Sequence, residues 1–378
     1  MISRIIEKAI VAKLFKGKVL LIFGARQVGK TTLIHRIIEM INQPTLVLNG
    51  DEADVRELLS NTTSRKLKAY FANNKLIIID EAQLIPDIGI TLKLITDQLK
   101  DIQVIATGSS AFELADKTSE SLTGRKYEFY LFPFSFGELV AQNGLLDERR
   151  MLEHRLIFGH YPEIVTNEIQ AKEHLKLIAS SYLFKDILML GNIKKTYLLD
   201  KILRALAFQI GNEISFNEIG NLVQTKSETV EKYIDLLEKA YIIFRLPAFS
   251  RNVRNEITKG KKIYFFDNGI RNAIIGSFDP IEKRTDTGAL WENFIVSERM
   301  KFQRNTGKDT AMYFWRTTQQ QEIDLIEEEE NTLSAYEIKW RKKKTHFSKT
   351  FLNAYPDCKT NLIMKDNYDD FLMHFEES

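Results

Sequence analysis

The chain contains 378 residues, of which 44% are hydrophobic and 28% are charged, and its formal net charge is +2. This composition is typical of a globular protein, and the length predicts two or three domains. The small net charge excludes a chain that is basic overall, so any contact with nucleic acid must come from a local basic surface. The single cysteine, Cys358, excludes an internal disulfide and indicates a reducing, intracellular setting.

The N-terminal residues carry no sign of membrane targeting. Charged side chains such as Arg4, Glu7 and Lys8 interrupt the apolar residues there, so no signal-peptide core is predicted. No run approaches the roughly 20 consecutive apolar residues that a membrane-spanning helix needs. We therefore expect a cytoplasmic protein without a membrane partner.

The first motif predicts a buried strand followed by a phosphate-binding loop. Val19 to Phe23 form a short apolar run, as expected of a strand that is buried on both faces. The next eight residues fit the pattern G-x-x-x-x-G-K-[ST]: Gly24, Ala25, Arg26, Gln27, Val28, Gly29, Lys30 and Thr31. A helix is predicted to follow, with Thr32 near its start. Backbone N–H groups of this loop would bind the phosphates of ATP. Lys30 would reach the β- and γ-phosphates, and Thr31 would bind Mg²⁺.

A second motif supplies acidic residues for the same site. Leu76 to Ile79 predict another buried strand, which ends in Asp80 and Glu81. Asp80 would hold Mg²⁺, and Glu81 would polarise the water that attacks the γ-phosphate. The alternative is an acidic strand end that caps the next helix, but the pairing with the first motif favours the catalytic interpretation.

Two further positions are weaker candidates. Thr107 and Ser109 follow a third strand, at the edge where parallel sheets bind ligands, but Thr-Gly-Ser-Ser is equally suited to a turn or a helix cap. Arg125 precedes a strand at Tyr127 to Leu131. It could stabilise charge on the nucleotide of a neighbouring subunit in a homo-oligomer, or it could be a surface arginine.

These motifs resemble those of the AAA+ class of P-loop ATPases. More closely, the segments GARQVGKTTL, IIIDEAQ, ATGSSAFEL, LTGR and FPFSFGEL resemble a prokaryotic family of predicted ATPases with a C-terminal domain of unknown function. The resemblance extends along nearly the whole chain, through GHYPEIV and LWENFIVSE. It implies an α/β ATPase core of parallel strands at residues 1–140 and a helical lid at 141–196. His160, in the lid, is expected to be a packed or solvated residue.

Residues 197–275 predict a winged helix-turn-helix. Amphipathic helical patterns precede two strand patterns at Tyr241 to Leu246 and Lys261 to Asp267. The segment between the two strands is basic, and so is the start of the second strand. The following residues could contact DNA phosphates: Arg251, Arg254, Lys259, Lys261 and Lys262. The mixed charge of the second helix is unlike a typical major-groove reader, so a protein–protein module is the alternative.

Residues 276–378 predict the element order helix, three strands, helix and strand. With Asp324 on one strand and Glu337-x-Lys339 on the next, this order resembles the PD-(D/E)xK, or restriction-endonuclease-like, α/β fold. Glu292 lies on the first helix. Asp324, Glu337 and Glu292 could bind Mg²⁺, and Lys339 could orient the attacking water. The run Glu327 to Glu330 is expected to form a solvated hairpin turn.

Two functions stay open for the C-terminal part. The lone E-x-K pattern is common, the segment EIDL lacks the proline of the family name, and the fold also has inactive versions that only bind. The first hypothesis is an ATP-driven, metal-dependent nuclease. The alternative is a nucleotide-gated switch whose C-terminal domains only bind DNA or a protein partner. A scaffold that does not bind DNA is a third possibility, which predicts no salt-dependent affinity for DNA.

Overall fold

The computed structural model describes residues 2–108, 121–182, 195–250, 260–308, 310–317, 319–330, 332–341 and 347–373. Within these ranges the chain forms two compact units. The first is formed mainly by the residues up to Phe132, and the second mainly by the residues from Pro133 onward.

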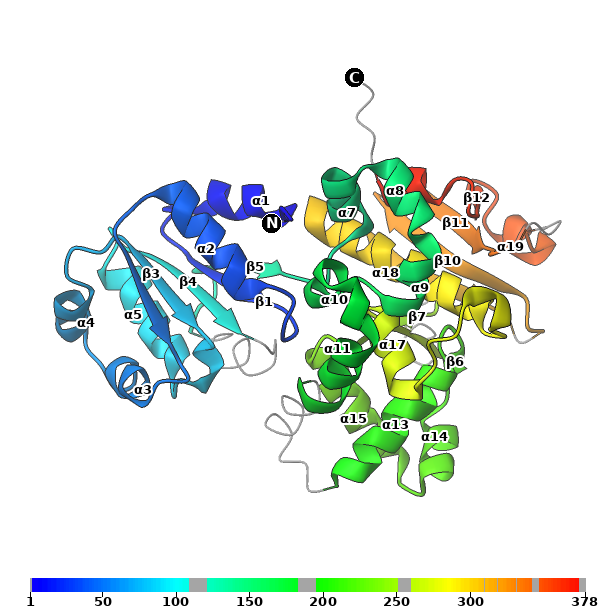
Figure 1. Cartoon of the computed structure of the whole chain (residues 1–378), viewed down its shortest axis with the longest axis horizontal. Helices are drawn as coiled ribbons and strands as arrows, with labels where there is room; N and C mark the ends of the chain where they lie inside the picture. The colour runs from blue at the N-terminus through cyan, green and yellow to red at the C-terminus, as the bar shows by residue number, and fades with distance from the viewer. Residues whose placement is uncertain are drawn as a thin grey trace. The chain divides into compact units, whose positions relative to one another are not determined.

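The first unit is built around a parallel sheet with the strand order β2-β3-β4-β1-β5 (Figure 1). Its strands are β1 (Val19–Phe23), β2 (Thr45–Asn49), β3 (Leu76–Asp80), β4 (Gln103–Gly108) and β5 (Lys126–Tyr130). Its helices include α1 (Ile6–Lys13), α2 (Lys30–Ile41), α3 (Ala53–Leu59), α4 (Ser64–Phe71) and α5 (Ile88–Gln98). Every residue of β1 and β4 is buried, which explains why these strands are continuous apolar runs. The predicted parallel α/β core is confirmed.

The second unit contains many short helices and two sheets. Its helices include α7 (Phe136–Asn143), α8 (Leu145–Arg150), α9 (Leu152–Phe158), α10 (Pro162–Thr166), α11 (Ala171–Leu177), α13 (Thr196–Phe208), α14 (Phe216–Val223), α15 (Ser227–Lys239), α17 (Asn268–Ile275), α18 (Thr287–Thr306), α19 (Lys349–Ala354) and α20 (Tyr368–Leu372). The antiparallel sheet β6-β8-β7 comprises β6 (Glu213–Ile214), β7 (Ile243–Pro247) and β8 (Lys261–Phe265). The sheet β12-β11-β10-β9 comprises β9 (Ala311–Arg316), β10 (Glu322–Glu329), β11 (Thr332–Ile338) and β12 (Lys359–Ile363).

The order of elements follows the predictions for this unit. Helices α13, α14 and α15 precede β7 and β8, and the order α18, β9, β10, β11, α19, β12 follows. Strands β9, β10 and β11 are antiparallel neighbours, whereas β12 runs parallel to β11. A single apolar cluster joins both regions, because Leu246 and Tyr264 pack together with Trp291, Phe314 and Leu325. The predicted winged-helix and nuclease-like regions therefore share one core.

A buried carboxylate fixes the chain where it begins the second unit. Glu298, on α18, is 2% exposed. It accepts hydrogen bonds from Phe136 N at 2.6 Å and Lys301 Nζ at 2.7 Å, and His160 Nδ1 lies 3.0 Å away. His160 Nδ1 is also 3.0 Å from the carbonyl oxygen of Phe134, so this nitrogen faces two acceptors and carries a hydrogen. His160 is thus a packed residue, as expected, that ties Phe134 to α18.

The prediction of a solvated turn at Glu327 to Glu330 is wrong at its first residue. Glu327 is buried in β10, where Arg299 donates to both of its carboxylate oxygens at 2.7 and 2.8 Å. Gln303 and Tyr336 donate to it as well. The sequence alone did not reveal these partners, because they lie on α18 and β11 and reach Glu327 only in the folded unit.

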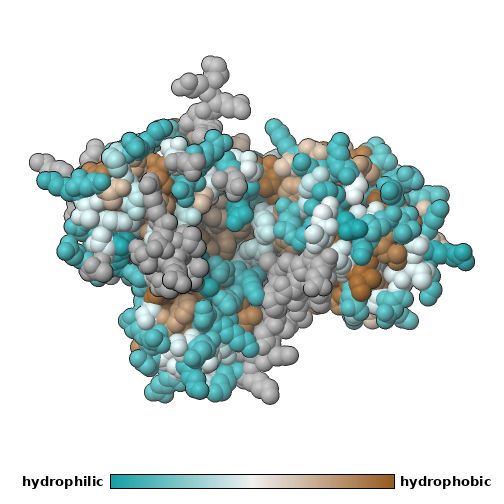
Figure 2. Space-filling view, turned by 180° about the vertical axis from the view of Figure 1, so that it is seen from behind, coloured by the Kyte–Doolittle hydropathy of each residue, from teal (hydrophilic) through white to brown (hydrophobic). Residues whose placement is uncertain are grey.

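On the face drawn in Figure 2, hydrophilic residues prevail and hydrophobic residues gather in small separate patches. Among the described residues, no helix has the length and apolar character needed to cross a membrane.

The Glu298 contacts predict that stability depends on acidity. Burial alone would raise the pKa of Glu298, but Lys301 and His160 lower this pKa to about 2. A carboxylate with a lowered pKa stabilises the fold above its ordinary pKa of 4.5, and this stabilisation is lost as the pH falls toward about 2. We expect Glu298→Gln to lower the melting temperature at pH 7 and to flatten its fall below pH 4.5. Glu173→Gln, at an exposed position, is the control; the same pH profile in wild type and Glu298→Gln would contradict the assignment.

Candidate functional site

The loop after β1 encloses the ammonium of Lys30. Lys30 is the first residue of α2 and is buried, and its Nζ donates to the carbonyl oxygens of Gly24 at 2.8 Å and Ala25 at 3.0 Å. A Cβ at Gly24 would lie 2.2 Å from the carbonyl oxygen of Leu131, so only glycine fits there. Gly29 has a φ of 94°, which also favours glycine. The predicted loop therefore forms, with Thr31 and Thr32 exposed beside it.

Polar side chains from the start of α2 and from the ends of β3 and β4 meet at this loop. Thr31 Oγ1 donates to Asp80 Oδ2 at 3.1 Å, and Thr107 Oγ1 donates to Asp80 Oδ1. The backbone N–H of Glu81 lies 3.3 Å from Thr107 Oγ1. Hydroxyl and carboxylate oxygens are the ligands that Mg²⁺ prefers, and the enclosed ammonium of Lys30 suits a phosphate. The residues present thus fit a magnesium nucleotide.

Glu81 is held in an unusual backbone conformation. Its φ is +49°, and Gln83 Nε2 donates to its Oε2 at 2.5 Å. Gly50 packs directly against it, since a Cβ at Gly50 would lie 2.4 Å from the carbonyl oxygen of Glu81. Left-handed conformations of residues other than glycine are concentrated at functional sites, where surrounding contacts maintain them. Gln83 and Gly50 are two such supports that the sequence motifs did not identify.

Arg4 is a further residue that sequence reasoning missed. It is buried, and its guanidinium donates to the carbonyl oxygen of Val28 in the loop and to that of Phe132 at 3.0 Å. Glu7 and Arg36 complete this network, with Arg36 Nε 3.0 Å from Glu7 Oε1. No local motif marks Arg4, because the contact to Phe132 spans 128 positions of the chain.

Arg125 does not lie at the loop in the same unit. It directly precedes β5, and its carbonyl oxygen accepts from Val19 N at the start of β1, the opposite edge of the sheet from the loop. Its Nε lies 2.7 Å from Asp97 Oδ1, and this hydrogen bond lowers the pKa of Asp97. The role in a neighbouring subunit stays a prediction, which a rise of specific ATPase activity with protein concentration would support. Ser109 lies outside the described residues.

In the second unit, Asp324 and Glu337 converge on one ammonium. Lys339 Nζ lies 2.8 Å from Asp324 Oδ2 and 2.8 Å from Glu337 Oε2. The strands β10 and β11 pair antiparallel with Leu325 opposite Tyr336, so Asp324 and Glu337 occupy adjoining positions. Asp324 Oδ2 also accepts from Ile338 N at 2.8 Å. The predicted trio therefore comes together.

Glu292 has different partners. Its Oε1 accepts from Lys262 Nζ at 2.9 Å and from Tyr264 Oη at 2.6 Å, and both of these residues belong to β8. Lys262 also forms an ion pair with Glu322 on β10. We refer to Lys262, Glu292, Glu322, Asp324, Glu337 and Lys339 together as the carboxylate–lysine cluster.

The electrostatics of this cluster reflect its burial. Burial and the charge of Asp324 raise the pKa of Glu337, although Lys339 opposes the shift. Burial is also the main reason that the pKa of Glu292 is raised. Within the described part of the chain, no group of three or more His, Cys, Asp or Glu side chains is placed to hold a metal ion. The carboxylates predicted as magnesium ligands are instead paired with lysines, so this arrangement does not fit the metal.

The expectation that Lys262 contacts DNA phosphates is wrong, because its side chain is 1% exposed and paired with carboxylates. Lys261, the preceding residue on the strand, is partly exposed and stays a candidate. Arg251, Arg254 and Lys259 lie outside the described residues.

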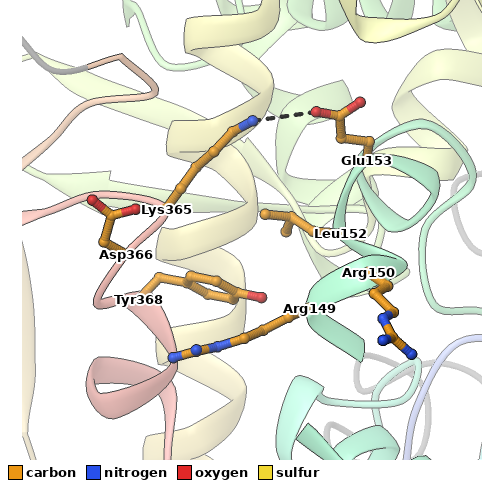
Figure 3. Close-up of a pocket in the computed structure, with 7 residues that line it drawn as sticks. All are labelled: Arg149, Arg150, Leu152, Glu153, Lys365, Asp366 and Tyr368. Atoms are coloured by element: carbon orange, nitrogen blue, oxygen red, sulfur yellow. Dashed lines mark hydrogen bonds and ion pairs between the residues drawn. The ribbon is translucent and has the colours of Figure 1, made fainter. Parts of the chain in front are cut away.

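A pocket of about 420 Å³ opens elsewhere in the second unit. Figure 3 shows the side chains around it, among them Arg149, Glu153, Lys365 and Tyr368. Lys365 Nζ lies 3.2 Å from Glu153 Oε1, and Arg149 is paired with Asp369. No predicted site residue lines this pocket.

Comparison with known families matches three segments of the chain. Residues 16–140 match the AAA domain, and residues 287–373 match a domain of unknown function, DUF4143. The chain joins an AAA domain to this C-terminal domain. Residues 149–280 match another domain of unknown function, DUF8612. The sheet and loop of the first unit accordingly form an AAA+ P-loop fold of the nucleotide-binding ATPase type.

The similar proteins do not supply an activity for the chain. An uncharacterized protein of Mycobacterium tuberculosis is 27% identical over 335 residues, which cover 86% of this chain and 71% of the relative. One of Methanocaldococcus jannaschii is 25% identical over 388 residues, which cover 96% and 84%. Among solved structures, Aeropyrum pernix ORC1 in complex with DNA has 12% identity and a TM-score of 0.34, covering 72% of this chain and 91% of that one. Thermotoga maritima RuvB has 16% identity and a TM-score of 0.33, covering 68% and 95%. These scores are too low to support an argument.

The Arg4 contacts predict a role for the N-terminal segment in the AAA domain. In Arg4→Met, two buried carbonyl oxygens lose a charged donor, at a cost of about 1–3 kcal/mol each. We expect thermal unfolding to occur roughly 4 °C lower or more, and a fluorescent ATP analogue to bind more weakly. Lys8→Met, at an exposed position on α1, is the control. Unchanged stability and nucleotide affinity in Arg4→Met would show that the contacts to Val28 and Phe132 are dispensable.

Proposed function

We propose that the AAA domain binds ATP with Mg²⁺ and hydrolyses it, and that its nucleotide state controls the C-terminal unit. The observation that supports this most directly is the convergence of Lys30, Thr31 and Asp80, with Thr31 Oγ1 only 3.1 Å from Asp80 Oδ2. Lys30 and Thr31 begin α2, directly after the loop, and Asp80 ends β3. The loop follows β1, and the carboxyl ends of β1 and β3 lie at the same edge of the parallel sheet.

Each residue has a distinct task in this proposal. Gly24 to Gly29 form the loop whose N–H groups bind phosphate oxygens, and Lys30 exchanges its two carbonyl partners for the β- and γ-phosphates. Thr31 and Asp80 hold Mg²⁺, which supplies charge neutralisation on the phosphates when bound. Glu81 accepts a hydrogen bond from the attacking water, and Gln83 orients its carboxylate. Thr107 fixes Asp80 through its hydroxyl.

The chain itself offers a route between the two units. Leu131 N donates to Phe23 O at 2.7 Å, and the carbonyl group of Leu131 packs against Gly24 at the start of the loop. Arg4 holds the next residue, Phe132. The chain then begins the second unit, where Phe134 and Phe136 bond to His160 and Glu298.

Both ends of this short connection are therefore anchored, one at the nucleotide loop and the other at α18. A shift of the loop on nucleotide binding or hydrolysis would act on the residues that begin this connection. This favours a nucleotide-gated function, in which the C-terminal unit responds to the state of the ATPase.

The C-terminal unit has a second candidate function, DNA cleavage. The proximity of Asp324, Glu337 and Lys339 supports it, together with the order α18, β9, β10, β11, α19, β12, which is the order predicted from the sequence. The lysine pairing described above does not fit a bound metal, and we therefore derive no metal-dependent step. Binding of DNA or a protein partner without cleavage is the alternative.

The ATPase proposal predicts separate effects of two substitutions. In Lys30→Ala the phosphates lose a buried cation, so we expect the dissociation constant of MgATP to rise roughly 100-fold. Glu81→Gln is expected to bind MgATP normally but to hydrolyse it about 100-fold more slowly, because the group that accepts the water proton is gone. Calorimetric titration and phosphate release measure the two effects. Lys93→Ala, at an exposed position on α5, is the control, and normal turnover by Glu81→Gln would contradict the assignment.

The cleavage candidate is tested with duplex, single-stranded and branched DNA, in Mg²⁺ or Mn²⁺, with and without ATP. We expect any cleavage to be lost in Glu337→Ala, since that change removes one of the two carboxylates that converge on Lys339. Glu329→Ala, at the exposed end of β10, is the control. Intact DNA in every lane, beside salt-dependent DNA binding, would leave the switch as the function of the unit.

A further inference from the structure

Lys262 is an unusual residue for the centre of a protein core. Its side chain is 1% exposed, yet it carries an ammonium group on β8. A buried charge is tolerated only when it is paired. Lys262 Nζ meets this requirement with Glu292 Oε1 at 2.9 Å and with the carboxylate of Glu322. Its partners come from α18 and β10, so three elements meet at this one ammonium.

The other half of the cluster is arranged in the same way. Lys339 Nζ lies 2.8 Å from both Asp324 and Glu337, so each of the four carboxylates is paired with a lysine. Burial alone would lower the pKa of the Lys262 ammonium, but the surrounding carboxylates, first that of Glu292, raise it. Asp324 is among the groups that act on it, which places the two halves of the cluster within electrostatic reach of each other.

This pairing explains why the cluster does not present a metal site. A divalent cation of the Mg²⁺ or Mn²⁺ type takes up about six oxygen ligands. Glu292 is the third predicted ligand, and its Oε1 is already shared by Lys262 and the hydroxyl of Tyr264 at 2.6 Å. A cation bound at Glu292 would compete with both donors for this carboxylate and would place a second positive charge beside the buried ammonium, which is costly.

We propose that Lys262 is an internal cation that takes the place of a metal ion in the carboxylate–lysine cluster and keeps Glu292 unavailable to divalent cations. The cluster is then locked by a residue of β8, a strand outside the four-stranded sheet that carries Asp324 and Glu337. The inference concerns cation binding only, and it holds whether or not the C-terminal unit cleaves DNA.

The test replaces the ammonium by an apolar group of similar length. Mn²⁺ binding to the full-length protein would be measured from the electron paramagnetic resonance signal of free Mn²⁺, without nucleotide. All proteins would carry Asp80→Asn, so that the magnesium site of the AAA domain does not contribute. We expect Lys262→Met to bind one Mn²⁺ per chain at least about tenfold more tightly than the same protein with Lys262, because a nearby positive charge has been removed.

Two further variants test the mechanism. Lys261→Met changes the neighbouring residue of the same strand, whose side chain points to the opposite face, and should leave Mn²⁺ binding unchanged. Adding Glu292→Gln to Lys262→Met should abolish the new site, since Glu292 is one of the two carboxylates that Lys262 releases and is the one proposed to bind the cation. If Lys262→Met binds Mn²⁺ and Lys262→Met with Glu292→Gln does not, the bound Mn²⁺ lies in the cluster and not at a surface site.

Folding is checked by near-ultraviolet circular dichroism. If Lys262→Met does not fold, the double variant Lys262→Met/Glu322→Gln replaces it. This variant has one fewer uncompensated carboxylate and still carries Glu292, Asp324 and Glu337. It should bind Mn²⁺, and its melting temperature should be higher with Mn²⁺ than without. The proposal is overturned if the protein with Lys262 binds one Mn²⁺ as tightly as the variants do and loses it on Glu292→Gln. It is also overturned if a folded variant without Lys262 binds none.

Discussion

The second unit depends on the rule that a buried charge must have a partner. Glu298 satisfies it with Phe136 N, His160 and Lys301, and through these contacts α18 holds the segment where the chain begins the second unit. The same helix carries Glu292, which faces β8, and Arg299, which pairs with Glu327 of β10. Helix α18 therefore contacts the segment that begins the second unit, the three-stranded sheet and the four-stranded sheet.

The AAA domain follows a different constraint, the geometry of a parallel sheet. Strands that run in the same direction end at one edge of the sheet. The short local motifs at the ends of β1, β3 and β4 are therefore brought together by the sheet itself. Close backbone contacts then set the positions finely, as at Gly24 against Leu131 and at Gly50 against Glu81. The outcome is a site whose residues are prepared for a phosphate and a cation before either is bound.

The two sites differ in how they balance charge. At the nucleotide loop, Lys30 donates to two neutral carbonyl oxygens, which a more strongly charged phosphate can replace at low cost. In the carboxylate–lysine cluster, by contrast, each lysine already faces full negative charges, and Lys262 is removed from solvent. The first arrangement is open to a ligand, whereas the second resists one. This contrast gives the inference about Lys262 its physical basis.

The sequence by itself determined the nucleotide loop, the strand Val19–Phe23, the Asp80–Glu81 strand end and the proximity of Asp324, Glu337 and Lys339. Each of these depends on spacing along one or two adjacent elements. The ion pairs of Lys339 with the two carboxylates, in place of a metal ion, were not predicted. It also predicted the order of elements in the second unit. Its errors lay where the partner is distant in the chain. Lys262 looked like one basic residue among several, and Glu327 like part of an acidic turn, until β8, β10 and α18 packed together.

Arg4 and His160 illustrate the same limit, with contacts that span 128 and 138 positions. Local patterns specify which elements form and which residues share a face. Only the tertiary structure decided which charges neutralise one another, because burial and pairing arise when those faces meet.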